Sequence, residues 1–306
     1  MPCPAPERAR RQIFVVVRKA KDFTEQRFED STMIPKIIHY CWFGRGKKPE
    51  LIEKCMATWK KVLPEYEIKE WNEDNFDISS VQYVREAYKE RKWAFVSDYV
   101  RLYALYHEGG IYMDTDVEVL KPIDRFLSLP AFSGYQDADQ CLTGIMGSEK
   151  GGEWVKDMLD DYIGRSFYRA NGEINETTNV EYTTYLMRTK KGMKIDGQEE
   201  TLEGYVTFFP VDYFCPKLCT EGVVNLTENS YTIHHFSGSW LGRRRLFVRT
   251  LKRYFGNMVG YYFDYFTRRP DVVVKNIILS CRRKWAKLRG RTFEEPDKDP
   301  IQKYKI

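Results

Sequence analysis

The sequence lacks any apolar run long enough to cross a membrane as a helix. A spanning helix needs about 18 consecutive apolar residues, whereas the apolar run at 13–17 contains only five. The seven cysteines are irregularly spaced and include no Cys-x-x-Cys pair, which excludes the usual zinc and dithiol motifs. Internal repeats and low-complexity segments are also missing. These absences predict a globular protein with reduced thiols that is not integral to a membrane.

Charge is distributed unevenly along the 306 residues. The formal net charge is +5, but residues 241–306 contain 18 Lys and Arg against 6 Asp and Glu, a local charge of +12. The remaining residues contain 31 against 38, a charge of −7. Aromatic and apolar clusters alternate with the basic residues of this tail, which predicts basic amphipathic helices that lie on an anionic lipid surface. An ordinary solvated face has the same composition and stays open as an alternative.

Residues 1–32 differ in composition from the rest of the chain. They are proline-rich at the start and then charged and irregular, and the first convincing strand begins only after Met33. We expect this segment to be a disordered arm, or translation to begin at Met33. The chain is therefore predicted to have three parts, which are an arm at 1–32, a domain at 33–240 and the basic tail at 241–306.

Hydrophobic periodicity predicts strands and helices in alternation through the first half of the domain. Alternating or continuous apolar runs predict strands, and apolar residues three or four apart predict helices. The predicted strands before residue 114 are 36–43, 66–71 and 111–113, and the predicted helices are 49–62, 80–91 and 94–107. Further strands are predicted at 131–135, 141–146, 206–214 and 231–235, and further helices at 153–162 and 176–189. This order predicts an α/β fold with a Rossmann-like, open, mostly parallel sheet flanked by helices.

Two aspartates, Asp114 and Asp116, follow the third predicted strand. In an extended segment, side chains two residues apart point to the same side, so both carboxylates can hold one cation. Oxygen ligands suit Mg²⁺ and Mn²⁺, which keep positions free for substrate phosphates. The strand order places these aspartates and the loop 42–46 at one edge of the sheet, where open α/β sheets bind ligands. A second Asp-x-Asp triplet, at 137–139, has no apolar strand directly before it and is interpreted as a turn.

The helix predicted at 94–107 contains three polar residues, Ser97, Asp98 and Arg101, in an otherwise apolar and aromatic stretch. Spacings of three and four place these side chains on one patch of the helix. A charged pair in a helix this apolar must be paired or must face a cavity. Two interpretations stay open, which are a structural salt bridge between Asp98 and Arg101 and a polar wall of the ligand crevice.

Two adjacent histidines, His234 and His235, precede Trp240 near the end of the acidic part of the chain. Neutral imidazole is a good ligand for ions of the Mn²⁺ class, so one histidine can complete a site begun by two aspartates. Paired histidines also occur at strand ends without a metal. Trp240 can stack on a sugar or base, or close the core.

Taken together, these segments resemble glycosyltransferase family 32, which includes capsular polysaccharide synthesis proteins and relatives of the yeast initiating α-1,6-mannosyltransferase. The resemblance is carried, in the family's order, by the blocks IPKIIHYCWFG at 34–44, AFVSDYVR at 94–101, GGIYMDTD at 109–116 and HHFSGSW at 234–240. A more distant similarity extends to the glucosylating domains of the large clostridial toxins. The combination of four blocks is far more specific than any one of them.

The resemblance implies a GT-A fold and a nucleotide-sugar donor site. It places Trp42 near the nucleotide base, and it places Ser97, Asp98 and Arg101 at the donor sugar. Asp114 is expected at the ribose and sugar hydroxyls, near the metal. Asp98, Arg101 and Asp114 are therefore the predicted catalytic residues.

The resemblance also implies a metal ion, Mn²⁺ or Mg²⁺, at the Asp-x-Asp motif. Asp116 is expected to bind the ion directly, with Asp114 beside it and His235 as a further ligand. Trp240 is expected at the β-phosphate of the donor. Of these assignments, His235 is the one for which the toxins differ, because they have a carboxylate near that position.

The predicted function is metal-dependent, retaining transfer of a sugar from a nucleotide-sugar to a glycan or glycolipid acceptor in surface polysaccharide biosynthesis. No nucleic-acid partner is expected, and the tail predicts a cytoplasmic protein that is peripheral on the inner face of the cell membrane. Two alternatives belong to other classes. A metal-dependent phosphohydrolase also uses Asp-x-Asp, although it normally needs more carboxylates or a nucleophilic Asp. A protein that binds an anionic surface, nucleic acid or membrane, is suggested by the tail alone.

Overall fold

The computed structural model describes residues 34–217 and 223–238. The predictions for residues 1–32, for Trp240 and for the basic tail concern residues outside these ranges. Within the described ranges, no helix is both long enough and apolar enough to pass through a bilayer.

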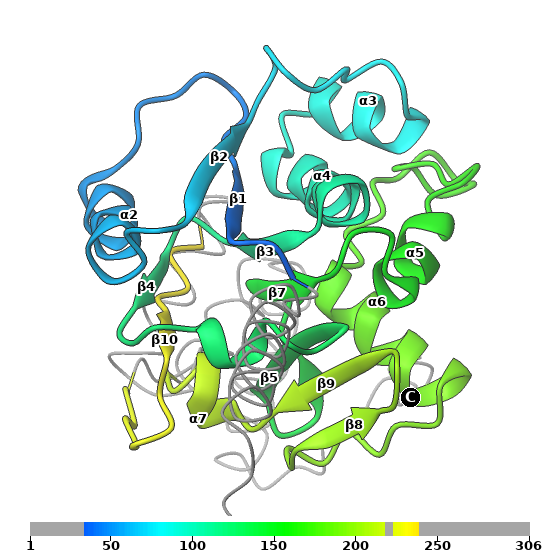
Figure 1. The fold of residues 1–306 in the computed structure, drawn as a ribbon. Helices are drawn as coiled ribbons and strands as arrows, with labels where there is room; N and C mark the ends of the chain where they lie inside the picture. The colour runs from blue at the N-terminus through cyan, green and yellow to red at the C-terminus, as the bar shows by residue number, and fades with distance from the viewer. Residues whose placement is uncertain (1–33, 218–222, 239–306) are drawn as a thin grey trace, which may run out of the picture. The chain divides into compact units, whose positions relative to one another are not determined.

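An eight-stranded sheet forms the centre of the described part of the chain (Figure 1). The strand order is β2-β1-β3-β7-β5-β9-β8, and β6 pairs with β5 beside this path. The strands are β1 (Ile37–Cys41), β2 (Glu67–Trp71), β3 (Gly110–Met113), β5 (Ala131–Asp137), β6 (Gln140–Cys141), β7 (Ile145–Ser148), β8 (Glu200–Leu202) and β9 (Val206–Phe209). Along the path, β7 and β8 run opposite to the other strands. The sheet is mixed but mostly parallel in direction, which confirms the predicted α/β fold.

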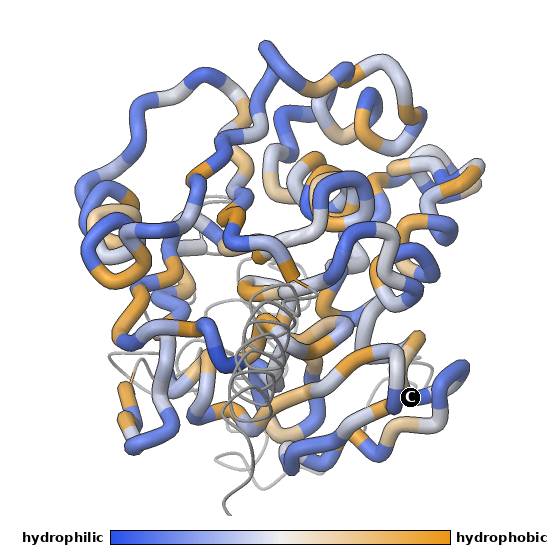
Figure 2. The backbone as a smooth tube through the Cα atoms, in the orientation of Figure 1, coloured by the Kyte–Doolittle hydropathy of each residue, from blue (hydrophilic) through white to orange (hydrophobic). Residues whose placement is uncertain are grey.

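Helices flank the sheet (Figure 1). The helices are α2 (Glu50–Val62), α3 (Gln82–Lys89), α4 (Trp93–Glu108), α5 (Glu153–Asp160), α6 (Asn179–Tyr185) and α7 (Val211–Phe214), with short 3₁₀ and π turns at Asp124–Phe126 and Leu186–Lys190. Helix α4 packs against β1, β3 and β7, and α3 and α5 pack against α4. Hydrophilic and hydrophobic residues alternate along α2, as expected for a helix with one buried face (Figure 2).

The end of α4 is set by a glycine. Gly109 has a φ of +71°, in the left-handed region that side chains with a Cβ rarely adopt. A Cβ at this position would lie 2.8 Å from the backbone nitrogen of Lys150. The chain can therefore turn directly from α4 into β3, which brings the helix with Arg101 beside the strand that leads to Asp114.

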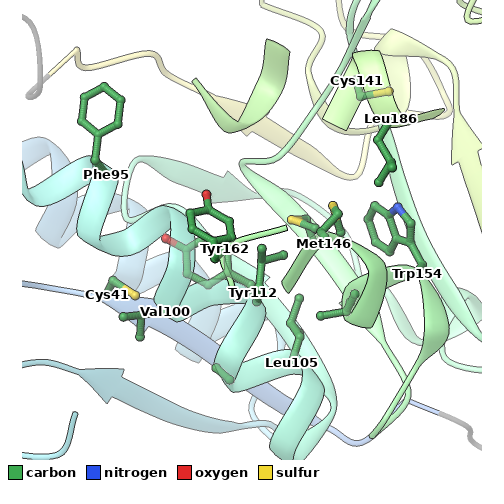
Figure 3. Packing of buried hydrophobic residues seen from close by; sticks show 14 of the residues in the cluster. Cys41, Phe95, Val100, Leu105, Tyr112, Cys141, Met146, Trp154, Tyr162 and Leu186 are labelled. Atoms are coloured by element: carbon green, nitrogen blue, oxygen red, sulfur yellow. The ribbon is translucent and has the colours of Figure 1, made fainter. Parts of the chain in front are cut away.

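Two clusters of buried side chains make up the core. One cluster includes residues of α3, α4 and α5 together with Cys41, Tyr112 and Met146 of the sheet. Figure 3 shows this packing, with Phe95, Val100 and Leu105 of α4, Trp154 of α5 and the sheet residues Cys41, Tyr112 and Met146. The other cluster contains Trp59 of α2, Val117, Val119 and parts of β1 and β3. The central strands β1, β3 and β7 are thus buried on both faces.

A separate two-stranded ribbon joins distant parts of the sequence. Strand β4 (Val117–Val119) pairs antiparallel with β10 (Thr232–His234), and His234 lies opposite Val117. The buried Trp59 of α2 donates its indole N–H to the carbonyl of Val117 at 2.7 Å. Neither β4 nor its pairing with β10 was predicted from the sequence, and this pairing brings the histidines to the aspartates.

Some predicted elements were wrong in extent, for local reasons. The strand predicted at 206–214 ends at Phe209, because Pro210 has no backbone N–H for the sheet, and α7 follows. The strand predicted at 141–146 is divided between β6 and β7. The helix predicted at 176–189 is a short α6 followed by a π turn. The triplet at 137–139 lies at the β5–β6 turn, as predicted.

Candidate active site

The site is built on the turn between β3 and β4. The backbone N–H of Asp114 donates to the carbonyl of Gly144 at 2.8 Å, and the N–H of Val117 donates to the carbonyl of Asp114 at 3.0 Å. These two hydrogen bonds fix a tight turn at the carboxyl end of β3. Both carboxylates of the Asp-x-Asp motif are thereby held at the edge of the sheet where β1 and β3 end.

Three potential metal ligands come together at this turn. Asp114, Asp116 and His234 each offer one ligand atom, and these atoms all lie within 4.8 Å of one another. Nε2 of His234 is 3.2 Å from Oδ1 of Asp116 and 3.7 Å from Oδ2 of Asp114. In the part of the chain that the structure describes, this is the one group of three such residues. A carboxylate–carboxylate–imidazole set suits Mn²⁺ or Mg²⁺, and the donor atoms fit such an ion.

The histidine of this cluster is His234, whereas the sequence prediction named His235. Neighbouring residues at the end of a strand point to opposite sides, and only His234 points to the aspartates. Nε2 of His235 lies 2.8 Å from Oε2 of Glu118. Its backbone N–H donates to the carbonyl of Asp116 at 3.0 Å. His235 thus supports the turn through its backbone, and its ring is directed to another carboxylate.

Asp116 and His234 are buried and form a coupled pair. The backbone N–H of Ser237 donates to Oδ2 of Asp116 at 2.6 Å. Burial acts to raise the pKa of Asp116, but the nearby His234 and the Ser237 hydrogen bond outweigh it and hold this pKa well below its usual range. Burial acts to lower the pKa of His234, but Asp116 outweighs it and raises that pKa well above its usual value. The two pKa shifts share one cause, which is the attraction between the Asp116 carboxylate and the positively charged form of the His234 ring.

Gly144 has no side chain, and this leaves room for the cluster of Asp114, Asp116 and His234. A Cβ on Gly144 would lie 3.1 Å from the His234 ring and 3.2 Å from Oδ2 of Asp114. Such distances are tighter than ordinary van der Waals contact, so a side chain would push either ligand away. Gly144 thus helps to form the site, because it leaves room for the ligands although it contributes no ligand atom.

Arg101 joins the helix patch to the aspartates. It is buried, and its Nη2 donates to Oδ1 of Asp98 at 2.9 Å. Its Nη1 donates to the carbonyl of Thr143 at 2.7 Å and lies 3.4 Å from Oδ1 of Asp114. The two interpretations left open by the sequence are therefore compatible, because the salt bridge exists and the same guanidinium reaches the Asp-x-Asp motif.

Asp98 lies behind Arg101 in a buried position. Burial raises its pKa to about 6, although the positive charge of Arg101 acts in the opposite direction. The backbone N–H of Asn179, at the start of α6, also hydrogen-bonds Asp98 and favours its charged form. The Asn179 side-chain oxygen accepts a hydrogen bond from Thr143 at 3.0 Å. Three elements, α4, α6 and the loop before β7, thus meet at Asp98.

The remaining predicted residues lie nearby or outside the described part. Ser97 is half-buried and donates its hydroxyl to the carbonyl of Trp93 in its own helix at 3.0 Å. Trp42 directly follows β1, and its indole N–H donates to the carbonyl of Gly46 at 2.7 Å. It is half-buried, and Nζ of Lys48 lies 5.2 Å from its ring centroid. Trp240 falls outside the described residues.

Two residues of this site were not named from the sequence. Tyr112 donates its hydroxyl to Oδ1 of Asp114 at 3.0 Å, and it is buried against Arg101. Its position two residues before Asp114 on the same strand face was a usable signal. Asn179 follows Thr178, which forms a capping box with Glu181. The Thr-x-x-Glu pattern was visible in the sequence and marks the helix start that touches Asp98.

Comparison with known proteins bears on this geometry. Residues 49–133 match the family described as "Glycosyltransferase sugar-binding region containing DXD motif". "Inositol phosphoceramide mannosyltransferase 3" of Schizosaccharomyces pombe is 30% identical over 128 residues, which are 40% of this chain and 35% of the relative. Residues 49–133 of this chain are thus similar to the sugar-binding region of glycosyltransferases that contain a DXD motif. The matched region includes Asp98, Arg101, Asp114 and Asp116.

Other relatives are similar to part of the same domain. "Uncharacterized glycosyltransferase L373" of Acanthamoeba polyphaga mimivirus is 27% identical over 157 residues, covering 48% of this chain and 61% of the relative. The chain thus spans less than two thirds of either curated relative. Two solved structures, "PaToxG Glycosyltransferase" and a glycosyltransferase involved in glycosylation of the major capsid of PBCV-1, each have a TM-score of 0.40, at 18% and 12% identity. The match to the first structure covers 58% of this chain and 79% of that protein. The match to the second covers 66% of this chain and 95% of that protein.

Proposed function

We propose that this chain transfers a sugar from a nucleoside-diphosphate sugar to a glycan or glycolipid acceptor, with Mn²⁺ or Mg²⁺ as cofactor. The observation that supports this most strongly is the convergence of Asp114, Asp116 and His234 within 4.8 Å, with buried Arg101 beside Asp114. Three protein ligands leave coordination positions for the two phosphates of a donor. A bound divalent cation would neutralise the charge that develops on the departing diphosphate.

The chain's own residues supply orientation and fixed charge. Arg101 is held by Asp98 and the Thr143 carbonyl, so its charge is already in place before the donor arrives. A preorganised charge of this kind stabilises a transition state without further rearrangement. Asp98 and Asn179 are proposed to hydrogen-bond the donor sugar, and Trp42 to lie near the base. Asp114, whose side chain is partly exposed, is proposed to contact the ribose or sugar hydroxyls as well as the ion.

We infer retention of configuration by front-face displacement. The site carboxylates are all engaged, Asp98 by Arg101, Asp114 by Tyr112, and Asp116 by His234 and Ser237. None is offered as a free nucleophile for a covalent intermediate. In the proposed step the acceptor oxygen bonds to the anomeric carbon as the bond to the diphosphate breaks. The acceptor proton passes to an oxygen of the departing phosphate.

The proposed acceptor is a lipid-linked glycan or glycolipid, in surface polysaccharide biosynthesis. One relative is named for a ceramide-based lipid substrate, and the basic tail has the composition of a segment that lies on anionic lipid. A cytoplasmic protein, peripheral on the inner face of the cell membrane, would meet such an acceptor at the bilayer surface. A nucleic-acid partner is not proposed, because residues 1–240, which precede the basic tail, carry a net negative charge.

The deciding experiment is incubation of the purified protein with Mn²⁺ and a panel of UDP- and GDP-sugars, followed by mass spectrometry. Slow donor hydrolysis by the wild-type protein, abolished by EDTA and in Asp116→Ala, supports the transferase. Phosphate release from simple monoesters without donor hydrolysis would instead indicate a phosphohydrolase. Salt-sensitive retention of oligonucleotides without either activity would indicate a nucleic-acid-binding protein.

A further inference from the structure

An exposed aliphatic segment lies between α7 and β10, the strand that carries His234. The large apolar side chains exposed in the described part of the chain are Leu51, Ile163, Tyr185, Val223, Val224 and Leu226. Half of them fall within four consecutive positions, and Val223, Val224 and Leu226 are 48%, 41% and 57% exposed. Single exposed apolar residues are normal, but such a local group marks an interaction site.

This segment is tied to the metal cluster by a short chain of contacts. Val224 forms an antiparallel bridge with Lys217, and the N–H of Asn225 donates to the carbonyl of Pro216 at 2.8 Å. Nζ of Lys217 donates to the carbonyl of His235 at 3.0 Å. The N–H of His235 in turn donates to the carbonyl of Asp116. The aliphatic segment is therefore fixed relative to the site.

Two cationic side chains and a tyrosine lie where the chain continues from the aliphatic segment into β10. Arg125 donates to the hydroxyl of Tyr231 at 3.0 Å, and Lys121 donates to the carbonyl of Glu228. Both cations lie about the Tyr231 ring, each 5.8 Å from its centroid. Among the described residues, neither forms an ion pair with a carboxylate, so their charge is available to an anionic partner. Aliphatic side chains together with tyrosine and such cations match the composition of bilayer interfaces.

We propose that Val223, Val224 and Leu226 insert into the surface of an anionic bilayer and hold the active site against it. The proposal rests on the proposed function, since it concerns where a lipid-linked acceptor is met. The tail that begins at residue 241 carries a charge of +12 and starts six residues after His235, so both proposed membrane contacts lie close in sequence to the metal cluster. A protein partner is a poorer fit, because a stable interface buries about 800 Å² on each side. Three side chains offer far less, whereas a bilayer needs no matching shape.

High salt separates the charge attraction between protein and lipid from the insertion of apolar side chains. Attraction between the tail and anionic lipid is screened at about 1 M salt, where the Debye length is about 3 Å. Insertion of aliphatic side chains is not screened in this way. Residual binding at high salt should therefore come from apolar insertion, by the apolar clusters of the tail as well as by the aliphatic segment. The share of the segment is the part that is lost when its three side chains are replaced.

The test compares two triple variants of the full chain that add the same charge. One is Val223→Asp, Val224→Asp and Leu226→Asp, and the matched control is Leu51→Asp, Ile163→Asp and Tyr185→Asp. Flotation is measured with phosphatidylcholine vesicles that contain about 30% phosphatidylserine, at about 0.1 M and about 1 M NaCl. The segment variant should bind about tenfold more weakly than wild type at high salt, and the control should bind as wild type does. Equal melting temperatures establish that both variants are folded.

Two results would overturn the proposal. One is a segment variant that floats like wild type at both salt concentrations. The other is light scattering that shows a wild-type dimer and a monomeric segment variant, because the patch is then an interface between copies. Donor hydrolysis without vesicles tests the proposed function separately. A protein that hydrolyses no donor but shows segment-dependent flotation refutes the transferase and leaves the membrane contact supported.

Discussion

Nε2 of His234 lies 3.2 Å from Oδ1 of Asp116, although strand β10 follows the motif by more than a third of the chain. Replacing either residue removes a ligand atom, so Asp116→Ala and His234→Ala should each weaken Mn²⁺ binding about a hundredfold or more. Titration calorimetry or the Mn²⁺ electron paramagnetic resonance signal measures the affinity directly. His235→Ala is the matched control and should retain Mn²⁺ affinity within about threefold. A large loss of Mn²⁺ affinity in His235→Ala, with none in His234→Ala, would show that His235 is the metal ligand.

Replacing Gly144 or Gly147 with alanine compares the effect of an added methyl group in the site with its effect in the core. In Gly144→Ala the added methyl meets His234 and Asp114 at 3.1–3.2 Å, and we expect Mn²⁺ affinity to fall about tenfold with little change in stability. In Gly147→Ala the methyl would lie 2.1 Å from the Phe132 ring, which should cost about 1–3 kcal/mol of unfolding free energy. Urea unfolding and Mn²⁺ titration separate the two effects. Unchanged Mn²⁺ affinity in Gly144→Ala would show that the site can hold an added methyl group without displacing its ligands.

Arg101 is expected to matter for stability as well as for donor binding. Arg101→Met removes the partner of buried Asp98 and leaves the Thr143 carbonyl without its donor. Breaking a buried pair from one side costs about 3–5 kcal/mol, which urea unfolding would report. The exposed pair of Arg45 and Asp74 is the control, and Asp74→Asn should have little measurable effect. A stable Arg101→Met protein with normal donor hydrolysis would contradict both roles.

His39 should contribute a pH dependence to stability. It is buried, its Nε2 faces the carbonyl of Gly109 at 2.8 Å, and its Nδ1 faces the indole N–H of Trp71 at 3.1 Å. Because the indole N–H can only donate, Nδ1 must accept, and the ring is neutral with its proton on Nε2. Burial lowers the pKa of His39 below its ordinary value of 6.5.

The sign of the effect is set by proton uptake. Below about pH 6.5 the unfolded chain binds a proton at His39 that the folded protein does not bind, so acid favours unfolding. The stabilisation is fully present above that pH and is lost as the pH falls toward the lower folded-state pKa. We expect the stability difference between wild type and His39→Gln, measured by urea unfolding, to shrink from about pH 7.5 to about pH 5. A difference that grows over this range would mean that the ring is charged in the folded protein.

Local signals in the sequence predicted most of the sheet and its helices. Helix α2 was predicted to within one residue, because its apolar residues follow helical spacing along its length. Asp114, Asp116 and Arg101 could be placed from the sequence because each lies in a short segment whose neighbours define its strand or helix. Long-range pairing was not accessible in this way. Whether His234 or His235 reaches the aspartates depends on the register of β10 against β4, which neither segment determines alone.

The pairing of β4 with β10 also has a consequence for the order in which the protein matures. Closing a loop between such distant segments is slow compared with forming α2 or the β1–β2 pair, because contacts remote in sequence form late. During synthesis, Asp114 and Asp116 emerge long before His234 is available to them. Tight capture of the ion must therefore wait for the last strand, and a nascent or truncated chain that ends before Thr232 cannot complete the site.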